Sequence, residues 1–154
     1  MLLLLWMVII MKNIEGDFED ITPHEIFSFA YELDEIRNDL NSTNSAVNRT
    51  IYVKIYYSVF LFLREWLKEH MGYKSLKGEH TKLPNFIKNN GPFGYEKNKE
   101  IYRGLTLLKK LRHRADYKLN VPKKYSLDYN KWEFTTIKSA FEIAESIIKT
   151  FKEF

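Results

Sequence analysis

An all-α fold, a single helical bundle, is what this sequence predicts. Apolar residues recur at helical spacing in several long stretches, and the first stretch begins with a helix-capping signal. The 154 residues fit one domain, and their 45 % apolar content is enough for a hydrophobic core. No internal repeat or linker divides the chain, so we expect a single domain over residues 11–154, preceded by an apolar extension at 1–10.

The first predicted helix begins sharply. Thr22 offers a capping hydroxyl, Pro23 suits the first helical position, and Glu25 completes a capping box. An apolar stripe at helical spacing follows, and we expect the helix to end near Asn41. His24, in the first turn, is expected to be exposed.

The second predicted helix is expected at the centre of the bundle. It begins within the capping cluster 42–45 and runs to about His70. Its middle, residues 51–67, is apolar on most sides, which is typical of a helix packed on several neighbours. Lys54 and Arg64 interrupt the apolar run, so we do not expect it to span a membrane.

Glycines and prolines divide the rest of the chain. Residues 72–94 are expected to be the least regular stretch, with at most one short amphipathic turn at 83–87. Two more helices are predicted over about 95–117 and about 127–152, each with apolar residues at helical spacing. Pro122 prevents a simple continuation from one to the other.

Several chemistries are excluded by composition. Cysteine is absent, so disulfides, thiolate nucleophiles and Cys-ligated zinc cannot occur. None of the four histidines stands in a metal-binding spacing, and we expect neither a metal site nor a cofactor. The chain also lacks a Gly-rich phosphate loop, which argues against ATP hydrolysis.

Charge is unevenly distributed along the chain. Residues 15–39 hold nine acidic residues and one basic residue, whereas residues 97–124 hold ten basic and two acidic residues. A basic region of this kind suits an anionic ligand. Alternatively, the acidic and basic regions attract each other, within one chain or across a dimer, and both alternatives can hold together.

The first ten residues are a continuous apolar run without charge. The run is too short to span a bilayer, which needs about 20 residues, and it lacks the features of a signal peptide. Because residues 11–13 resemble an ordinary cytosolic start, we expect translation to begin at Met11. A short membrane-surface anchor is the alternative. We expect a cytoplasmic protein without stable membrane association.

The end of the third predicted helix concentrates polar side chains, namely Arg112, His113, Arg114, Asp116 and Tyr117. Arg112 and Asp116 lie four residues apart and therefore share a helix face, and the same holds for His113 and Tyr117. Guanidinium groups bind phosphate, and an imidazole can move a proton near neutral pH. The alternative is an exposed ion pair worth a few tenths of a kcal/mol.

In the second predicted helix, Arg49 precedes a Tyr-Tyr-x-x-Phe segment at 56–60, and the third predicted helix ends in Arg-x-x-Ala-Asp-Tyr at 112–117. These two motifs and the order of the helices resemble the HEPN superfamily (higher eukaryotes and prokaryotes nucleotide-binding). One HEPN branch has the same helix ending, and His80 stands where that branch often has a loop histidine. The resemblance covers roughly residues 44–152.

The resemblance implies an up-and-down bundle of four to five helices that usually forms a homodimer with the motif ends facing one another. Many members are metal-independent ribonucleases with an Arg-x4–6-His motif, which act as toxins beside a small nucleotidyltransferase-type antitoxin. Carried over, Arg112 is the motif arginine, but Tyr117 stands where the histidine is expected. A phenol, with a pKa near ~10, is a much weaker base at neutral pH than an imidazole.

Three hypotheses follow. In the first, a HEPN-like dimer binds RNA or a nucleotide, or docks a nucleotidyltransferase partner; its candidate ligand-binding residues are Arg49, His80, Arg112, Arg114 and Asp116. In the second, the protein is a ribonuclease in which Tyr117 or His113 acts with Arg112. In the third, the acidic first helix and the basic third helix serve assembly only.

Single residues also have simpler interpretations. Arg49 can be a solvated or capping-region charge near a helix start, and His80 can be a surface histidine in an irregular loop. Tyr56 and Tyr57 are expected to be core and interface aromatics rather than platforms for base stacking.

Overall fold

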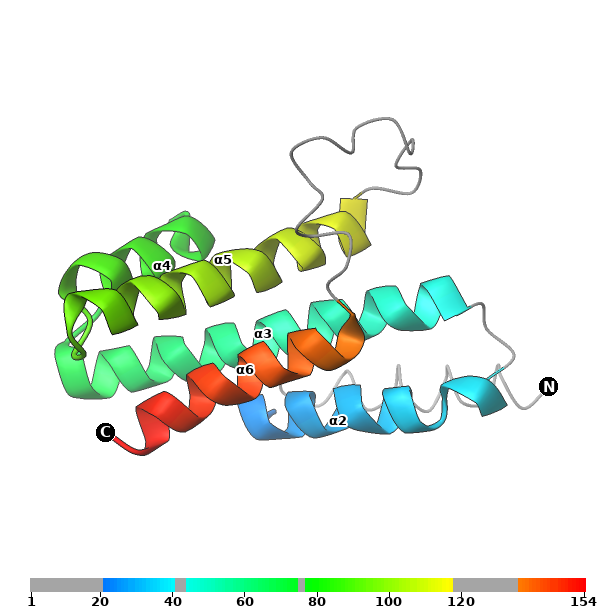
Figure 1. The fold of residues 1–154 in the computed structure, drawn as a ribbon. Coiled ribbons are helices and arrows are strands. Elements are labelled where there is room, and N and C mark those ends of the chain that lie inside the picture. The colour runs from blue at the N-terminus through cyan, green and yellow to red at the C-terminus, as the bar shows by residue number, and fades with distance from the viewer. Residues whose placement is uncertain (1–20, 41–43, 75–76, 118–135) are drawn as a thin grey trace.

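Four long helices run up and down alongside one another in the computed structural model, which describes residues 21–40, 44–74, 77–117 and 136–154 (Figure 1). Within these ranges the chain is helical and contains no strand. The elements are α2 (Pro23–Glu35), the 3-10 turn η1 (Arg37–Asp39), α3 (Asn44–Met71), the shorter α4 (Glu79–Asn90), α5 (Tyr95–Tyr117) and α6 (Ile137–Lys152). The predicted all-α up-and-down bundle is confirmed.

The capping box predicted for the first helix is present at the start of α2. The backbone N–H of Glu25 donates to Oγ1 of Thr22 over 3.2 Å, and the backbone N–H of Thr22 donates to Oε2 of Glu25 over 2.7 Å. His24 is exposed, as expected. These two bonds satisfy donors that the first turn of a helix leaves free.

The predicted end of that helix near Asn41 is wrong, because α2 ends at Glu35. Ile36 leaves the helical conformation with φ −89° and ψ 3°, and the chain tightens into η1. The side chain of Arg37 bonds back to the carboxylate of Asp34 and, over 3.3 Å, to its carbonyl oxygen. This bond satisfies a helix-end carbonyl without a further helical turn.

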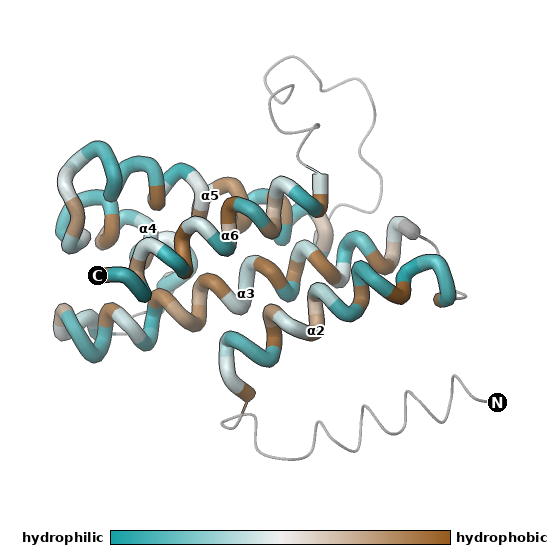
Figure 2. The backbone as a smooth tube through the Cα atoms, turned by 60° about the horizontal axis from the view of Figure 1, so that its bottom comes forward, coloured by the Kyte–Doolittle hydropathy of each residue, from teal (hydrophilic) through white to brown (hydrophobic). Residues whose placement is uncertain are grey.

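Helix α3 lies at the centre of the bundle, as predicted, and packs against α2, α5 and α6. One of its faces is fully buried at every fourth residue, through Ile51, Ile55, Val59, Leu63 and Leu67. Figure 2 shows hydrophobic and hydrophilic residues alternating along the helices. The burial of this long helix supplies much of the hydrophobic stabilisation of the fold.

Helix α4 corrects the prediction that residues 72–94 are irregular. It runs for 12 residues between Gly78 and Gly91, with Pro84 inside it. A proline at this place removes a helical hydrogen bond, which costs about 3 kcal/mol. Leu83, Pro84 and Ile87 are buried, and α4 packs along α5. Burial against α5 therefore offsets the unfavourable local sequence.

A buried asparagine fixes the turn between α4 and α5. Asn98 is 5 % exposed; its Nδ2 donates to the carbonyl oxygen of Gly91 over 3.0 Å, and its Oδ1 accepts from the backbone N–H of Phe93 over 3.2 Å. A Cβ atom at Gly91 would lie 2.5 Å from Oδ1 of Asn98. The turn therefore requires glycine at this position, and it determines how α4 lies against α5.

The acidic and basic helices lie on opposite sides of α3 (Figure 1). Helix α2 packs on α3, whereas α5 packs on α3, α4 and α6. Attraction between α2 and α5 within one chain therefore does not hold the described bundle together. Attraction across a dimer stays a prediction.

The last helix begins at Ile137, where the hydroxyl of Thr136 accepts from the backbone N–H of Ser139 over 3.1 Å. The predicted helical residues 127–135 and the apolar run 1–10 lie outside the described residues. None of the helices in the described ranges combines the length and apolar character that crossing a membrane requires.

Candidate functional site

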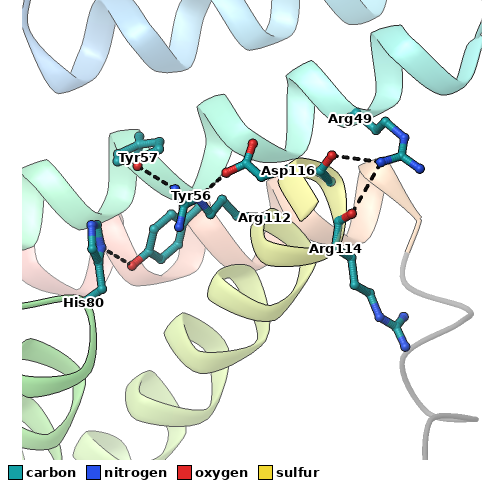
Figure 3. Close-up of polar contacts among 8 residues, drawn as sticks. Arg49, Tyr56, Tyr57, His80, Arg112, Arg114 and Asp116 are labelled. Carbon is teal, nitrogen blue, oxygen red and sulfur yellow. Dashed lines mark hydrogen bonds and ion pairs between the residues drawn. The ribbon is translucent and has the colours of Figure 1, made fainter. Parts of the chain in front are cut away.

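Arg112 is held firmly on the side of α5 that faces α3. Its Nη2 donates to the hydroxyl of Tyr57 over 2.9 Å, and its guanidinium lies over the Tyr57 ring, 5.2 Å from the centroid. Its Nε lies 2.6 Å from Oδ2 of Asp116, so the predicted pairing of Arg112 with Asp116 is confirmed (Figure 3). The two side chains are 17 % and 26 % exposed, so the pair is partly buried rather than exposed.

Two neighbouring tyrosines of α3 connect this arginine to α4. Tyr57 accepts the bond from Arg112, while Tyr56 is fully buried and its hydroxyl lies 2.7 Å from Nδ1 of His80. The expected core role of Tyr56 is confirmed. Because the two tyrosines reach in different directions, α3 joins His80 of α4 to Arg112 of α5 (Figure 3).

His80 does not lie in a loop, as the sequence predicted, but is the second residue of α4. It is half-buried, and its ring packs on the Phe60 ring at 4.3 Å between centroids. Burial lowers the pKa of His80, and the positive charges of Arg112 and Lys109 lower that pKa further. The imidazole is therefore favoured in its neutral form at neutral pH.

Lys109 is a member of the site that the sequence did not single out. Its Nζ donates to Oγ1 of Thr81 over 2.8 Å, which joins α5 to the first turn of α4. Burial lowers the pKa of Lys109, and the charge of Arg112 acts in the same direction. A signal was present in the sequence, because Lys109 and Arg112 are three residues apart and share a face of α5.

Arg49 reaches the end of α5 but contacts its backbone. Its Nη1 donates to the carbonyl oxygen of Ala115 over 2.9 Å and to that of Arg114 over 3.4 Å. Helix C-termini leave such carbonyls free and carry partial negative charge, so a guanidinium there stabilises α5. Arg49 is therefore not a solvated charge at the start of α3 but a capping charge at the end of α5.

The remaining predicted residues lie apart from this cluster. The side chain of Arg114 points away from Arg112 (Figure 3). His113 is exposed on α5. Tyr117 is the last residue of α5, and its side chain lies outside the described part of the structure. The imidazole brought close to Arg112 is thus that of His80.

The convergence of α3, α4 and α5 gathers cationic and titratable groups. Lys109 contacts Thr81 across the seam between α4 and α5, and His80 and Arg112 lie beside this contact, on the side toward α3. Arg64 of α3 is close enough to lower the pKa of His80. Guanidinium and ammonium groups of this kind bind phosphate oxygens. In the described ranges, no three His, Asp or Glu side chains form a group that could hold a metal ion.

The comparison with known proteins gives a similarity without a known function. The chain is similar to an uncharacterized protein of Methanocaldococcus jannaschii, with 31 % identity over 110 residues. The match covers 61 % of this chain and 63 % of that protein, so the chain spans less than two thirds of the length of its relative. No family model and no solved structure matches the chain significantly.

Proposed function

We propose that this chain is a HEPN-like protein that binds RNA or a nucleotide through Arg112. The observation that carries the proposal is the fixed position of the Arg112 guanidinium, between Tyr57 and Asp116 and beside the cationic Lys109. A guanidinium held in place loses little conformational freedom when it binds a phosphate. The resemblance of residues 45–60 and 111–117 to HEPN motifs also supports the proposal.

The cellular setting that we propose follows from the same resemblance. The protein acts in the cytoplasm of a prokaryote, as a homodimer, in a toxin–antitoxin or defence-type system with a small nucleotidyltransferase as its partner. Light scattering on the purified protein tests the dimer, and co-purification with a nucleotidyltransferase encoded beside it tests the pairing. A monomer that retains no such partner would contradict this setting.

Binding of a labelled single-stranded RNA at increasing salt concentration tests the binding function. Neutralised phosphates release counterions, so affinity is expected to fall steeply with salt. Arg112→Ala is expected to weaken binding by about tenfold or more, because a charge-assisted contact is lost. Arg103→Ala is the matched control, since Arg103 is an exposed arginine of the same helix. Absent or salt-insensitive binding would refute the proposal.

A second candidate function is a metal-independent ribonuclease with a degenerate motif. The observation that favours it is the imidazole of His80 beside Arg112, because such a pair can bind a phosphate and move a proton. Incubation with RNA in the presence of a chelator tests this candidate. Cleavage that disappears in Arg112→Ala and in His80→Gln, Tyr117→Phe or His113→Gln supports it, and no cleavage under any condition refutes it.

A further inference from the structure

We infer that the bound phosphate lies in the seam between α4 and α5, against His80, Lys109 and Arg112, and not at the C-terminal end of α5. This inference rests on the proposed function, since it locates the ligand of the same protein. It also adds Lys109 and the protonation of His80 to the binding chemistry.

The C-terminal end of α5 is a poor place for an anion. The last carbonyls of a helix carry partial negative charge, which repels phosphate. Arg49 is already bonded to two of those carbonyls, and the side chain of Arg114 points away from Arg112 (Figure 3). The nearby carboxylate of Asp116 is a further negative charge on this side of Arg112.

The seam offers positive charge instead. The Nζ of Lys109 bonds to the hydroxyl of Thr81, a neutral partner that leaves the ammonium charge unbalanced by that bond. Arg112 is close enough to Lys109 that its positive charge lowers the pKa of Lys109. A phosphate between them would relieve this repulsion, because its oxygens can accept from both cations.

His80 couples phosphate binding at this site to the uptake of a proton. The groups that face it are Tyr56, Tyr57 and Arg64 from α3, Glu79 beside it in α4, and Lys109 and Arg112 from α5. Only Glu79 among the charged groups favours the imidazolium, and burial and the three cations outweigh it. A bound phosphate adds negative charge, which favours the imidazolium. Phosphate binding is therefore accompanied by proton uptake at His80, and affinity rises as pH falls.

Substitutions of two neighbouring lysines of α5 test where the phosphate binds. We would measure fluorescence anisotropy of a short labelled oligouridylate with Lys109→Gln and with Lys110→Gln, which remove the same charge from adjacent positions. Lys109→Gln is expected to weaken binding about fivefold or more, and Lys110→Gln less than about twofold. Lys109→Arg, which keeps the charge, is expected to retain binding.

Thr81→Val tests whether Lys109 acts through its charge or through its contact with α4. The variant removes the hydroxyl that Lys109 contacts but leaves the ammonium group in place. Its RNA binding is expected to equal that of the wild type. Equal losses in Lys109→Gln and Thr81→Val would show that Lys109 acts as a structural link, and equal losses in Lys109→Gln and Lys110→Gln would show a diffuse charge effect. Either result overturns the inference.

The proton coupling is tested by repeating the binding measurement from about pH 8 to about pH 5.5, the range in which histidines titrate. The phosphodiesters and uracil bases of the probe do not titrate there, so any change belongs to the protein. Wild-type affinity is expected to rise several-fold as pH falls, and His80→Gln is expected to lose most of that rise. His24→Gln, which removes an exposed histidine far from the site, is expected to keep it.

The outcomes distinguish this inference from the proposed function. If the wild type does not bind RNA, the proposed function fails. If Arg112→Ala abolishes binding while Lys109→Gln and His80→Gln bind as the wild type does at every pH, the function stands and the seam is wrong.

Discussion

The hydroxyl of Tyr56 lies 2.7 Å from Nδ1 of His80, which fastens the first turn of α4 to the middle of α3. Burial raises the pKa of Tyr56, so its hydroxyl keeps its proton throughout the physiological range. The bond can persist when His80 gains a proton, because a phenol can donate to a neutral ring nitrogen or accept from a protonated one.

Tyr56→Phe tests the strength of this connection. The variant keeps the buried ring but leaves Nδ1 of His80 without its partner, and we expect it to lower the free energy of unfolding by about 1 kcal/mol. Urea denaturation followed by circular dichroism measures the change. Tyr95→Phe is the control, because Tyr95 is 64 % exposed and should change stability little. Equal stability of Tyr56→Phe and the wild type would contradict a role for the bond.

Stability should depend on pH through His80. Its pKa is below the ordinary value of 6.5 in the folded protein, so the unfolded chain binds more protons than the folded chain between the two pKa values. The free energy of unfolding is therefore expected to decrease as pH falls below 6.5 and to level off below the folded pKa. Urea denaturation over this range should show a smaller decrease in His80→Gln than in the wild type. An equal decrease in both proteins would assign the effect to other groups.

Local signals predicted α2 and α3, whereas α4 depends on its tertiary contacts. The capping box at Thr22 and the apolar spacing of residues 51–67 are properties of neighbouring residues, so the sequence reveals them directly. In α4 the local signals favour irregular structure, because Pro84 lies inside the helix. The helix is stabilised by burial of Leu83 and Ile87 on a surface that the sequence does not display.

The contacts of the site also fall into two groups, those that the sequence predicts and those that depend on helix packing. The pairing of Arg112 with Asp116 follows from their spacing on one helix, and it could be predicted. The contacts of Tyr57 with Arg112 and of Lys109 with Thr81 join different helices, 55 and 28 residues apart in the chain. Such contacts depend on how the helices are packed, and no spacing along the sequence indicates them.

Asp116→Asn is expected to strengthen RNA binding by about threefold. The carboxylate neutralises part of the charge of Arg112 and repels phosphate, and an amide of the same shape removes that negative charge. Anisotropy of labelled RNA at low salt measures the change, which should shrink as added salt screens the charges. Weaker binding by Asp116→Asn would mean that the carboxylate is needed to orient the guanidinium.

Arg49→Met should destabilise the protein by about 1–2 kcal/mol while changing RNA binding less than about twofold. The methionine keeps an unbranched side chain but cannot donate to the carbonyl oxygens of Arg114 and Ala115. Urea denaturation measures stability, with Arg103→Met as the exposed control. A large loss of RNA binding at unchanged stability would instead make Arg49 a ligand-binding residue.

The turn that orients α4 can be tested with two glycines. A Cβ atom at Gly91 would lie 2.5 Å from both Oδ1 of Asn98 and the carbonyl oxygen of Ile87, whereas a Cβ at Gly94 meets no atom within 4 Å. Gly91→Ala is therefore expected to destabilise the fold by about 1–3 kcal/mol, and Gly94→Ala to be neutral or slightly stabilising.

Because α4 carries His80 and Thr81, the shift that Gly91→Ala imposes on the turn should also reach the seam with α5. Folded Gly91→Ala is expected to bind RNA more weakly than Gly94→Ala at the same low temperature, where both variants remain folded. Thermal unfolding and RNA anisotropy on the same samples measure the two effects. Equal stability of the two variants would mean that the side chain of Asn98 and the carbonyl of Ile87 move aside at little cost, and that this turn does not fix the position of α4.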